Sequence, residues 1–315
     1  MSKEKKLLLA EPRGFCAGVV RAIETVERAL QIWGAPIYVK HEIVHNTHVV
    51  ERLKAMGAVF IENLADVPRG SRLIYSAHGV SPQVRQEAKA RGLIEIDATC
   101  GLVTKVHSAA KRYAAKGYQI ILIGHKTHVE IIGTRGEAPD QTTVVETVED
   151  VEKLNFAPQT PLFYLTQTTL SLHDVAQIAE ALKRKYPHIE TLPSSSICYA
   201  TTNRQLALRE ITNCTDLILV VGDRMSSNSN RLVEVALNAG IKAYLIHGPE
   251  EIKESWLANV TQLGLTAGAS TPEDVVQACI VRLSELGVTE IEKRVHTEEN
   301  VLFQLPRELT QESSS

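Results

Sequence analysis

Three short apolar stretches decide the fold, because each leads into a cysteine and then into a helical pattern. They read Lys6-Leu-Leu-Leu-Ala10 before Cys16, Leu93-Ile-Glu-Ile-Asp97 before Cys100, and His188-Ile-Glu-Thr-Leu192 before Cys198. Each stretch has the length and composition of a strand. An amphipathic segment follows each cysteine, at residues 19–32, 103–115 and 203–212. The chain therefore contains a repeat of about 90 residues that occurs three times.

The second half of each repeat keeps the same register. A second strand is expected at residues 36–39, 119–124 and 216–222, and each ends in a polar loop. In these loops His45 lies 29 residues after the first cysteine, while His128 and Ser226 each lie 28 residues after theirs. A third strand (58–62, 143–146, 243–246) and a fourth (73–80, 162–170, 263–270) complete each repeat. The last strand again runs into a polar loop and a helical pattern.

Strands that alternate with helices are typical of parallel sheets flanked by helices, with ligands bound at the carboxyl ends of the strands. We therefore expect an α/β protein of three similar small parallel-sheet domains in a pseudo-threefold arrangement around a central cavity. The domains are expected at residues 1–100, 101–197 and 198–285, although strands can be exchanged between repeats at the joins. Residues 286–315 are expected to pack across the repeats, with residues 311–315 disordered.

Composition narrows the function classes. The chain has 315 residues, a net charge of −3 and a pI near 6.4, so no general attraction to nucleic acid or to anionic membranes is expected. The N-terminal apolar run is too short for an export signal, and the longest apolar runs are strand-sized, so a cytoplasmic protein is expected. Five cysteines, an odd number, indicate reduced thiols or metal ligands and not a disulfide framework.

The repeat separates the cysteines into two groups. Cys16, Cys100 and Cys198 share a position at the start of a helix, where unpaired N–H groups and the helix dipole stabilise a thiolate. Cys214 and Cys279 have no counterpart in the other repeats and are interpreted as core residues. Three thiolates suit either zinc or an iron–sulfur cluster, and their spacing does not decide between the two.

A rival motif lies in the first repeat. His41-Glu-Ile-Val-His45 matches H-E-x-x-H, the signature of zinc proteases. That chemistry requires both histidines on one face of a helix. Here the motif follows the strand Pro36-Ile-Tyr-Val39 and occupies a turn, which argues against a zinc hydrolase.

Five longer motifs carry a resemblance to a known family. They are Pro-Arg-Gly-Phe-Cys-Ala-Gly (12–18), Asp-Ala-Thr-Cys (97–100), Thr-Gln-Thr-Thr-Leu-Ser (166–171), Ile-Cys-Tyr-Ala-Thr-Thr-Asn-Arg-Gln (197–205) and Ser-Ser-Asn-Ser-Asn-Arg (226–231). Together they closely resemble the 4-hydroxy-3-methylbut-2-enyl diphosphate reductases, the LytB/IspH family, over residues 7–309. One departure is Gly101, where proline is expected in many relatives.

The resemblance implies a site and a reaction. Cys16, Cys100 and Cys198 would ligate one 4Fe–4S cluster whose fourth iron stays open to the substrate hydroxyl. The implied substrate-binding residues are His45, His78, His128, Thr168, Thr169, Ser226, Ser227, Asn228 and Ser270, all in loops at strand ends. Many precede helices, whose N–H groups favour phosphate oxygens. Glu130 is the implied proton donor, with Thr168 passing protons between Glu130 and substrate.

The implied reaction removes the hydroxyl group as water, using two electrons and two protons, and yields isopentenyl and dimethylallyl diphosphate. This is the final step of the methylerythritol phosphate route to isoprenoids. A ferredoxin or flavodoxin is the expected electron donor, because no flavin or nicotinamide motif is present. A zinc hydrolase and a non-catalytic iron–sulfur sensor remain as alternatives.

Overall fold

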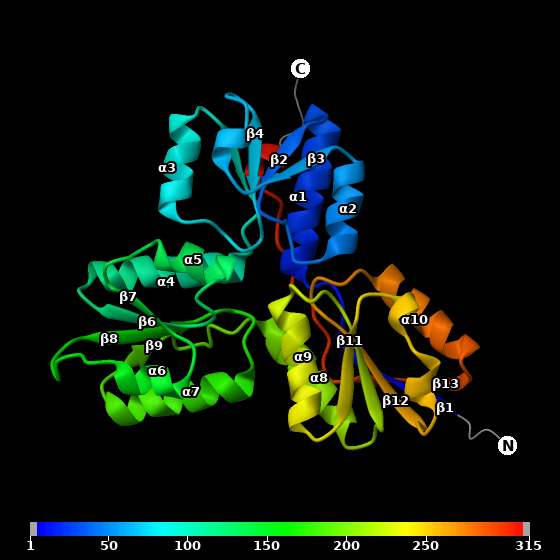
Figure 1. Cartoon of the computed structure of the whole chain (residues 1–315). Helices are drawn as coiled ribbons and strands as arrows, with labels where there is room; N and C mark the ends of the chain where they lie inside the picture. The colour runs from blue at the N-terminus through cyan, green and yellow to red at the C-terminus, as the bar shows by residue number, and fades with distance from the viewer. Residues whose placement is uncertain (1–4, 311–315) are drawn as a thin grey trace. The chain divides into compact units, whose positions relative to one another are not determined.

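A computed structural model describes residues 5–310. It contains three parallel sheets with helices packed on them, which confirms the expected α/β class (Figure 1). The described chain divides into two compact units. Unit 1 comprises residues 5–17, 45–49 and 199–302, and unit 2 comprises residues 18–44, 50–198 and 303–310. The expected disorder of residues 311–315 lies outside the described residues.

The first sheet belongs to unit 2 and has the strand order β3-β2-β4-β5. Its strands are β2 (Ile37–Lys40), β3 (Ala58–Ile61), β4 (Arg72–Tyr75) and β5 (Ile94–Asp97). The helices of this part are α1 (Ala17–Trp33), α2 (Thr47–Ala55), the short η1 (Leu64–Asp66) and α3 (Pro82–Ala90). Leu73 and Tyr75 of β4 are fully buried, and with Ala88 of α3 they form one core cluster.

The second sheet, also in unit 2, has the order β7-β6-β8-β9. Its strands are β6 (Gln119–Ile123), β7 (Thr142–Val145), β8 (Leu162–Thr166) and β9 (Glu190–Thr191), and its helices are α4 (Gly101–Ala115), α5 (Val129–Arg135), α6 (Val148–Lys153) and α7 (Leu172–Lys185). The two faces of the sheet form separate cores. One core joins Ile120 and Leu122 to α4 and α5, and the other joins Ile121 and Ile123 to α6 and α7.

The third sheet lies in unit 1 and has five strands in the order β11-β10-β12-β1-β13. These are β1 (Lys5–Glu11), β10 (Leu217–Val221), β11 (Lys242–Ile246), β12 (Gln262–Ala267) and β13 (Val288–Val295); the helices are α8 (Tyr199–Thr212), α9 (Ser227–Asn238), α10 (Glu273–Glu285) and the short η2 (Pro249–Glu251) and η3 (Glu254–Leu257). Helices α8 and α9 share a core with one face, and η3 and α10 share a core with the other.

The three sheets repeat one topology, but the strand before each cysteine pairs in an unexpected way. β5 and β9 each join the sheet of the strands that precede them in the chain. β1 has no preceding strands, and it pairs with β12 in the third sheet. The expected first domain, 1–100, therefore needs one correction, since residues 5–11 belong to the third sheet.

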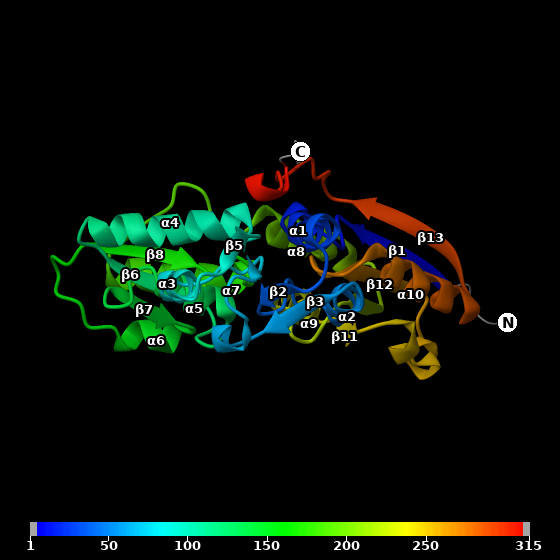
Figure 2. The same ribbon diagram turned by 90° about the horizontal axis from the view of Figure 1, so that it is seen from above.

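The C-terminal extension also departs from expectation. Residues 288–295 form β13, which pairs in parallel with β1 at the edge of the third sheet, so this part extends one sheet and does not merely cover the repeats (Figure 2). Farther along, the Arg21 side chain donates a 2.6 Å hydrogen bond to the carbonyl of Gln304 within unit 2. A short turn of helix, η4 (Arg307–Leu309), ends the described chain.

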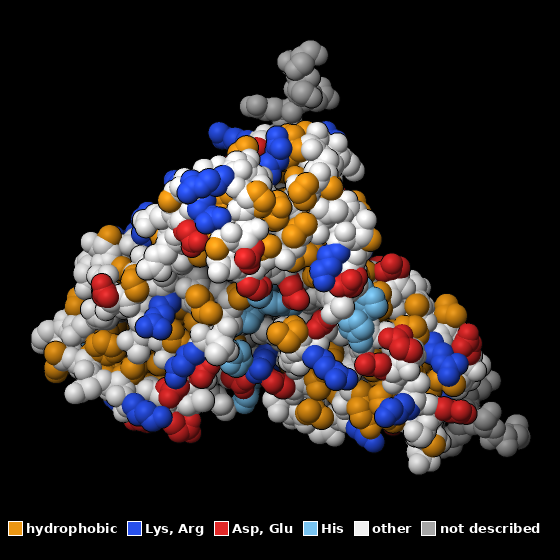
Figure 3. All heavy atoms as spheres, turned by 45° about the horizontal axis from the view of Figure 1, so that its top comes forward, with side chains coloured by type: hydrophobic (Ala, Val, Ile, Leu, Met, Phe, Trp, Pro, Cys, Tyr) orange, Lys and Arg blue, Asp and Glu red, His pale blue; other side chains and the backbone are white. Residues whose placement is uncertain are grey.

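Basic and acidic side chains are interspersed on the face drawn in Figure 3. Among the residues described, no helix is both long enough and apolar enough to cross a membrane.

Candidate active site

The backbone of each repeated cysteine makes the same hydrogen bond. The N–H groups of Cys16, Cys100 and Cys198 donate to the carbonyls of Ala269, Ala77 and Thr168, at 3.2, 3.0 and 3.0 Å. Each acceptor is the second residue after β12, β4 or β8, the strand beside the one that leads to the cysteine. The structure therefore confirms that the three cysteines occupy equivalent positions, each in front of a helix and each tied to a strand-end loop.

The residue after each acceptor carbonyl is one of the implied diphosphate ligands. His78, Thr169 and Ser270 follow Ala77, Thr168 and Ala269. All three are therefore the third residue after their strand and lie next to a loop that holds a cysteine. The sequence resemblance pointed to these residues separately, and the structure shows that they are equivalent.

Within unit 2, a continuous set of contacts leads from Cys100 to Cys198. The imidazole rings of His78 and His128 meet edge to face with their centroids 6.0 Å apart. His128 caps α5, accepting a hydrogen bond from the N–H of Glu130 at Nδ1 (3.2 Å). The Glu130 carboxylate in turn accepts bonds from Thr168, whose carbonyl receives the Cys198 N–H. The predicted acid–base pair is thus held between two cysteine loops.

Glu130 is buried beside few polar partners. Its side chain is 2% exposed. The N–H and the hydroxyl of Thr168 donate to its two carboxylate oxygens at 2.6 and 3.0 Å. Burial raises the pKa of Glu130 to about 7, because the loss of water outweighs these two hydrogen bonds, which favour the charged form. Near neutral pH this side chain can therefore hold or release a proton.

Within unit 1, a second set of contacts starts from the Cys16 loop. The hydroxyl of Ser270 donates to the carbonyl of His45 at 3.0 Å. Two residues further on, the N–H and hydroxyl of Thr47 donate to Asp223 at 3.0 and 2.7 Å. Although burial opposes it, these bonds and one from the Met225 N–H hold the pKa of Asp223 below its usual range. The His45 loop is thereby fixed to the loop that follows β10.

The N-terminus of α9 presents the remaining implied ligands. Ser226 is the N-cap and accepts a 3.3 Å hydrogen bond from the N–H of Ser229, and Ser227 opens the helix. The Asn228 amide is 3% exposed, and neither its nitrogen nor its oxygen has a hydrogen-bond partner among residues 5–310. A buried amide without a partner is costly. A polar ligand at this helix N-terminus would relieve that cost.

Two supporting residues were missed by the sequence reasoning. Arg204, on α8, is fully buried and donates to the carbonyl of Gly14 at 2.8 and 3.1 Å and to the Glu299 carboxylate at 3.0 Å, so it fixes the loop before Cys16. Gln167 is also fully buried, and its amide donates to the Thr169 hydroxyl at 3.0 Å. Both residues lie inside the quoted motifs. The motifs gave their positions in the chain, but no sequence signal indicated that their side chains are buried.

Two cysteines and one histidine were given no part in the expected site. Cys279 is buried in the core of the third sheet, and burial raises the pKa of its thiol to about 12. Cys214 was expected in the core, but it is exposed, because it lies in the turn between α8 and β10, and its Sγ donates to the carbonyl of Ile211. His107, which the sequence reasoning gave no role, is buried and pairs with Glu137 at 2.8 Å. The contacts of these three residues indicate structural roles.

The zinc-protease reading does not fit the local backbone. Residues 41–46, which include H-E-x-x-H, form a turn between β2 and α2, and no helix carries the two histidines. His41 has a positive φ of 62° and its Nδ1 lies 2.6 Å from Glu62. The motif therefore lacks the helical spacing that its chemistry requires.

Gly101 is explained by its neighbour. A side-chain carbon at this position would lie 3.1 Å from the ring of Phe303, closer than such contacts normally are. The departure from proline thus leaves room for Phe303 beside the start of α4.

The described residues contain no group of three or more His, Cys, Asp or Glu side chains gathered as a metal site. Cys16 belongs to unit 1, whereas Cys100 and Cys198 belong to unit 2. The side chain of each is half-buried, and none of the three is in a disulfide.

The fold and these two sets of contacts define an α/β protein with three equivalent cysteines and a buried, hydrogen-bonded Glu130–Thr168 pair. The LytB protein family model matches residues 7–284, and the chain belongs to that family. It is 70% identical over 302 residues to the 4-hydroxy-3-methylbut-2-enyl diphosphate reductase of Protochlamydia amoebophila, covering 96% of each chain. It is 64% identical to that of Chlamydia pneumoniae, covering 97% of this chain and 99% of the relative.

A solved structure is similar over nearly the whole length. The E-1-hydroxy-2-methyl-but-2-enyl-4-diphosphate reductase of Plasmodium falciparum superimposes with a TM-score of 0.96 at 51% identity, with 97% of each chain covered. This similarity agrees with the resemblance drawn from the five sequence motifs.

The buried arginine gives a stability prediction. Arg204→Ala should lower the free energy of unfolding of the full chain by about 3–5 kcal/mol, because it leaves Glu299 and the carbonyls of Gly14, Phe15 and Ala200 without their buried partner. Urea unfolding followed by circular dichroism measures this loss. Arg209→Ala, at an exposed position of the same helix, is the matched control. An equal, small loss in both variants would contradict the assigned role of Arg204.

Glu130 gives a pH prediction. Because its folded pKa is raised from 4.5 to about 7, its stabilising contribution is complete below pH 4.5 and is lost as the pH rises through 7. The unfolding free energy of the wild type, relative to Glu130→Gln, should fall by about 3 kcal/mol over this range. Unfolding at several pH values measures the difference. Glu180→Gln, on the exposed side of α7, should not reproduce it, and a flat difference for Glu130→Gln would refute the raised pKa.

Proposed function

We propose that this chain reduces 4-hydroxy-3-methylbut-2-enyl diphosphate to isopentenyl and dimethylallyl diphosphate, the final step of the methylerythritol phosphate route. The observation that carries the proposal is the buried Glu130–Thr168 pair, held between the loops of Cys100 and Cys198 in a LytB family chain. Loss of a hydroxyl group as water needs a proton source at the departing oxygen.

The chain is an iron–sulfur enzyme, and we assign its ligands to Cys16, Cys100 and Cys198. Their chemistry fits an iron–sulfur cluster, since all three are uncrosslinked, half-buried thiols in front of helices. Cys100 is the N-cap residue of α4, so its side chain lies at the N-terminal, positive end of the helix dipole, which stabilises a thiolate. A 4Fe–4S cluster with three protein ligands would supply electrons one at a time and an open iron for the substrate hydroxyl.

The diphosphate group is assigned to the strand-end loops. The residues proposed to bind it are His45, His78, His128, Thr169, Ser226, Ser227, Asn228 and Ser270. Imidazole, hydroxyl and amide groups donate hydrogen bonds to phosphate oxygens, and the N-termini of α5 and α9 add backbone N–H groups and positive dipole ends. The partnerless Asn228 amide supports this assignment, because a phosphate oxygen would satisfy its nitrogen.

Glu130 is assigned as the proton donor and Thr168 as the relay. With a pKa of about 7, a fraction of Glu130 is protonated at neutral pH, and burial keeps that proton from bulk water. The Thr168 hydroxyl lies 3.0 Å from one carboxylate oxygen, so it can donate to the substrate while it accepts from Glu130. The carbon–oxygen bond of the substrate breaks and a carbon–hydrogen bond forms. Two electrons and two protons are consumed, and the five-carbon diphosphate and water are released.

A ferredoxin or flavodoxin is the proposed electron donor, and the cytosol the proposed location. The sequence carries no nicotinamide- or flavin-binding motif, and a separate carrier protein is therefore the proposed source of the electrons. Five uncrosslinked cysteines agree with a reducing compartment.

Turnover tests the acid–base assignment. Glu130→Gln should keep the iron content and substrate affinity of the wild type and lose about 10²- to 10⁴-fold in turnover, the range typical of a general acid. Anaerobic turnover with a chemical reductant, with the two five-carbon diphosphates quantified, provides the measurement. Wild-type turnover in this variant would remove Glu130 from the reaction. No conversion by the wild type would favour the sensor alternative.

Metal analysis tests the ligand assignment. Cys16→Ser, Cys100→Ser or Cys198→Ser should abolish or strongly reduce the iron and sulfide content of anaerobically purified protein, because an alcohol replaces a thiolate ligand. Cys214→Ser and Cys279→Ser are the matched controls and should retain full iron. Loss of the cluster in either control, or stoichiometric zinc in the wild type, would overturn the assignment.

A further inference from the structure

The helix that follows Cys100 differs in charge from its two counterparts. α1 carries both Arg and Glu, and so does α8. From Gly101 to Tyr118 the chain has four cationic residues, Lys105, Lys111, Arg112 and Lys116, and no Asp or Glu. All four are exposed. Because the three helices are otherwise equivalent, this difference indicates a use that only α4 has.

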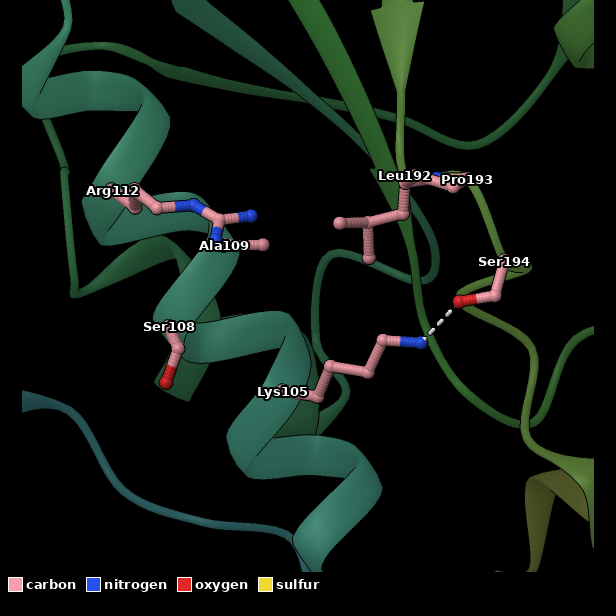
Figure 4. A pocket seen from close by; sticks show the side chains of 7 residues that line it. All are labelled: Lys105, Ser108, Ala109, Arg112, Leu192, Pro193 and Ser194. Atoms are coloured by element: carbon pink, nitrogen blue, oxygen red, sulfur yellow. Dashed lines mark hydrogen bonds between the residues drawn. The ribbon is translucent and has the colours of Figure 1, made fainter.

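A cavity of about 470 Å³ lies along this cationic face. Its lining combines one side of α4 with the segment that leads to Cys198: Lys105, Ser108, Ala109, Arg112, Leu192, Pro193 and Ser194. Figure 4 shows Lys105 and Arg112 extending from α4 at the edge of the cavity, with the Lys105 Nζ bonded to the Ser194 hydroxyl at 2.6 Å. The cavity thus has apolar walls and a cationic rim.

A second hollow of about 200 Å³ lies on the other side of Ser108 and is lined in part by Lys111. Two carboxylates, Asp97 and Glu137, also line it. Each has its own basic partner, since Asp97 pairs with Arg85 at 2.6 Å and Glu137 with His107 at 2.8 Å. The charge of Lys111 therefore remains available at the surface.

The cationic face is close to two of the proposed cluster ligands in sequence and in space. Cys100 directly precedes α4, and at 1.5 Å per residue Lys105 lies about 8 Å farther along the helix axis. Ser194 lies four residues before Cys198. A protein seated on this face would contact the two segments that hold Cys100 and Cys198.

We propose that this face, defined by Lys105, Ser108, Lys111, Arg112 and Ser194, is the docking site of an acidic one-electron carrier protein. The proposal rests on the proposed function, which needs two electrons for each substrate. Two reduced carriers would bind in turn, and each would be oxidised by one electron. With two protons, these electrons break the carbon–oxygen bond and form a carbon–hydrogen bond and water.

The size and charge of the face favour this occupant. Complexes between redox partners are small and transient, and complementary charge speeds their encounter. A local cationic face on a chain of net charge −3 suits a compact acidic protein better than a long nucleic acid, which the rest of the surface would repel.

Binding and turnover of the cluster-containing full chain test the proposal. The probe is a plant-type [2Fe–2S] ferredoxin of strongly negative net charge. The double variant Lys105→Glu with Arg112→Glu should bind oxidised ferredoxin about 10- to 100-fold more weakly by calorimetry, because two attractive contacts become repulsive. Turnover driven by reduced ferredoxin should fall similarly. Turnover driven by a small chemical reductant should stay at the wild-type level.

A matched control is Arg28→Glu with Lys89→Glu, which makes the same change in net charge at exposed positions of α1 and α3. It should bind ferredoxin as the wild type does. Equal losses in both double variants, or none in the α4 variant, would overturn the docking site. A different pattern would also overturn the docking site: the wild type binds duplex DNA, only the α4 double variant loses that binding, and ferredoxin binds the variant and the wild type equally. Absence of wild-type turnover with either reductant would refute the proposed function, and calorimetry would still decide the docking site.

Discussion

The structure depends on one hydrogen bond made three times, from the N–H of a repeated cysteine to the second residue after the neighbouring strand. In a parallel sheet, adjacent strands end at the same edge, so this bond ties two strand-end loops together. It also determines what lies beside the sulfur. The residue after each acceptor carbonyl is His78, Thr169 or Ser270, and all three are proposed phosphate ligands.

That constraint explains the position of the proposed acid–base pair, Glu130 and Thr168. Thr168 has two tasks, since its carbonyl accepts from the Cys198 N–H while its own N–H and hydroxyl donate to Glu130. The position of the carboxylate is therefore coupled to the cysteine loop. Burial then raises the pKa of Glu130 to about 7, which suits proton transfer at neutral pH. Support for the Cys16 loop comes instead from buried Arg204 and its partner Glu299.

The threefold repeat is a backbone pattern, and the proposed functional side chains are those that differ between the repeats. Equivalent loops carry His78, Thr169 and Ser270, so one position supplies an imidazole in one repeat and a hydroxyl in the other two. Equivalent loops after the second strands lead to His45, His128 and Ser226, of which the last two cap helices. The helices after the cysteines differ in the same way, because α4 alone lacks acidic residues. The repeated backbone places the loops, and the side chain at each equivalent position determines the chemistry of its loop.

The sequence by itself determined the α/β class, the equivalence of Cys16, Cys100 and Cys198, and the strand-end position of the proposed ligands, since hydrophobic periodicity and spacing are local properties. Only the tertiary structure decided that residues 5–11 complete the third sheet, because strand pairing joins segments far apart in the chain. It also decided the burial of Glu130, Gln167 and Arg204. Burial depends on what packs around a side chain from elsewhere, and no local pattern records that.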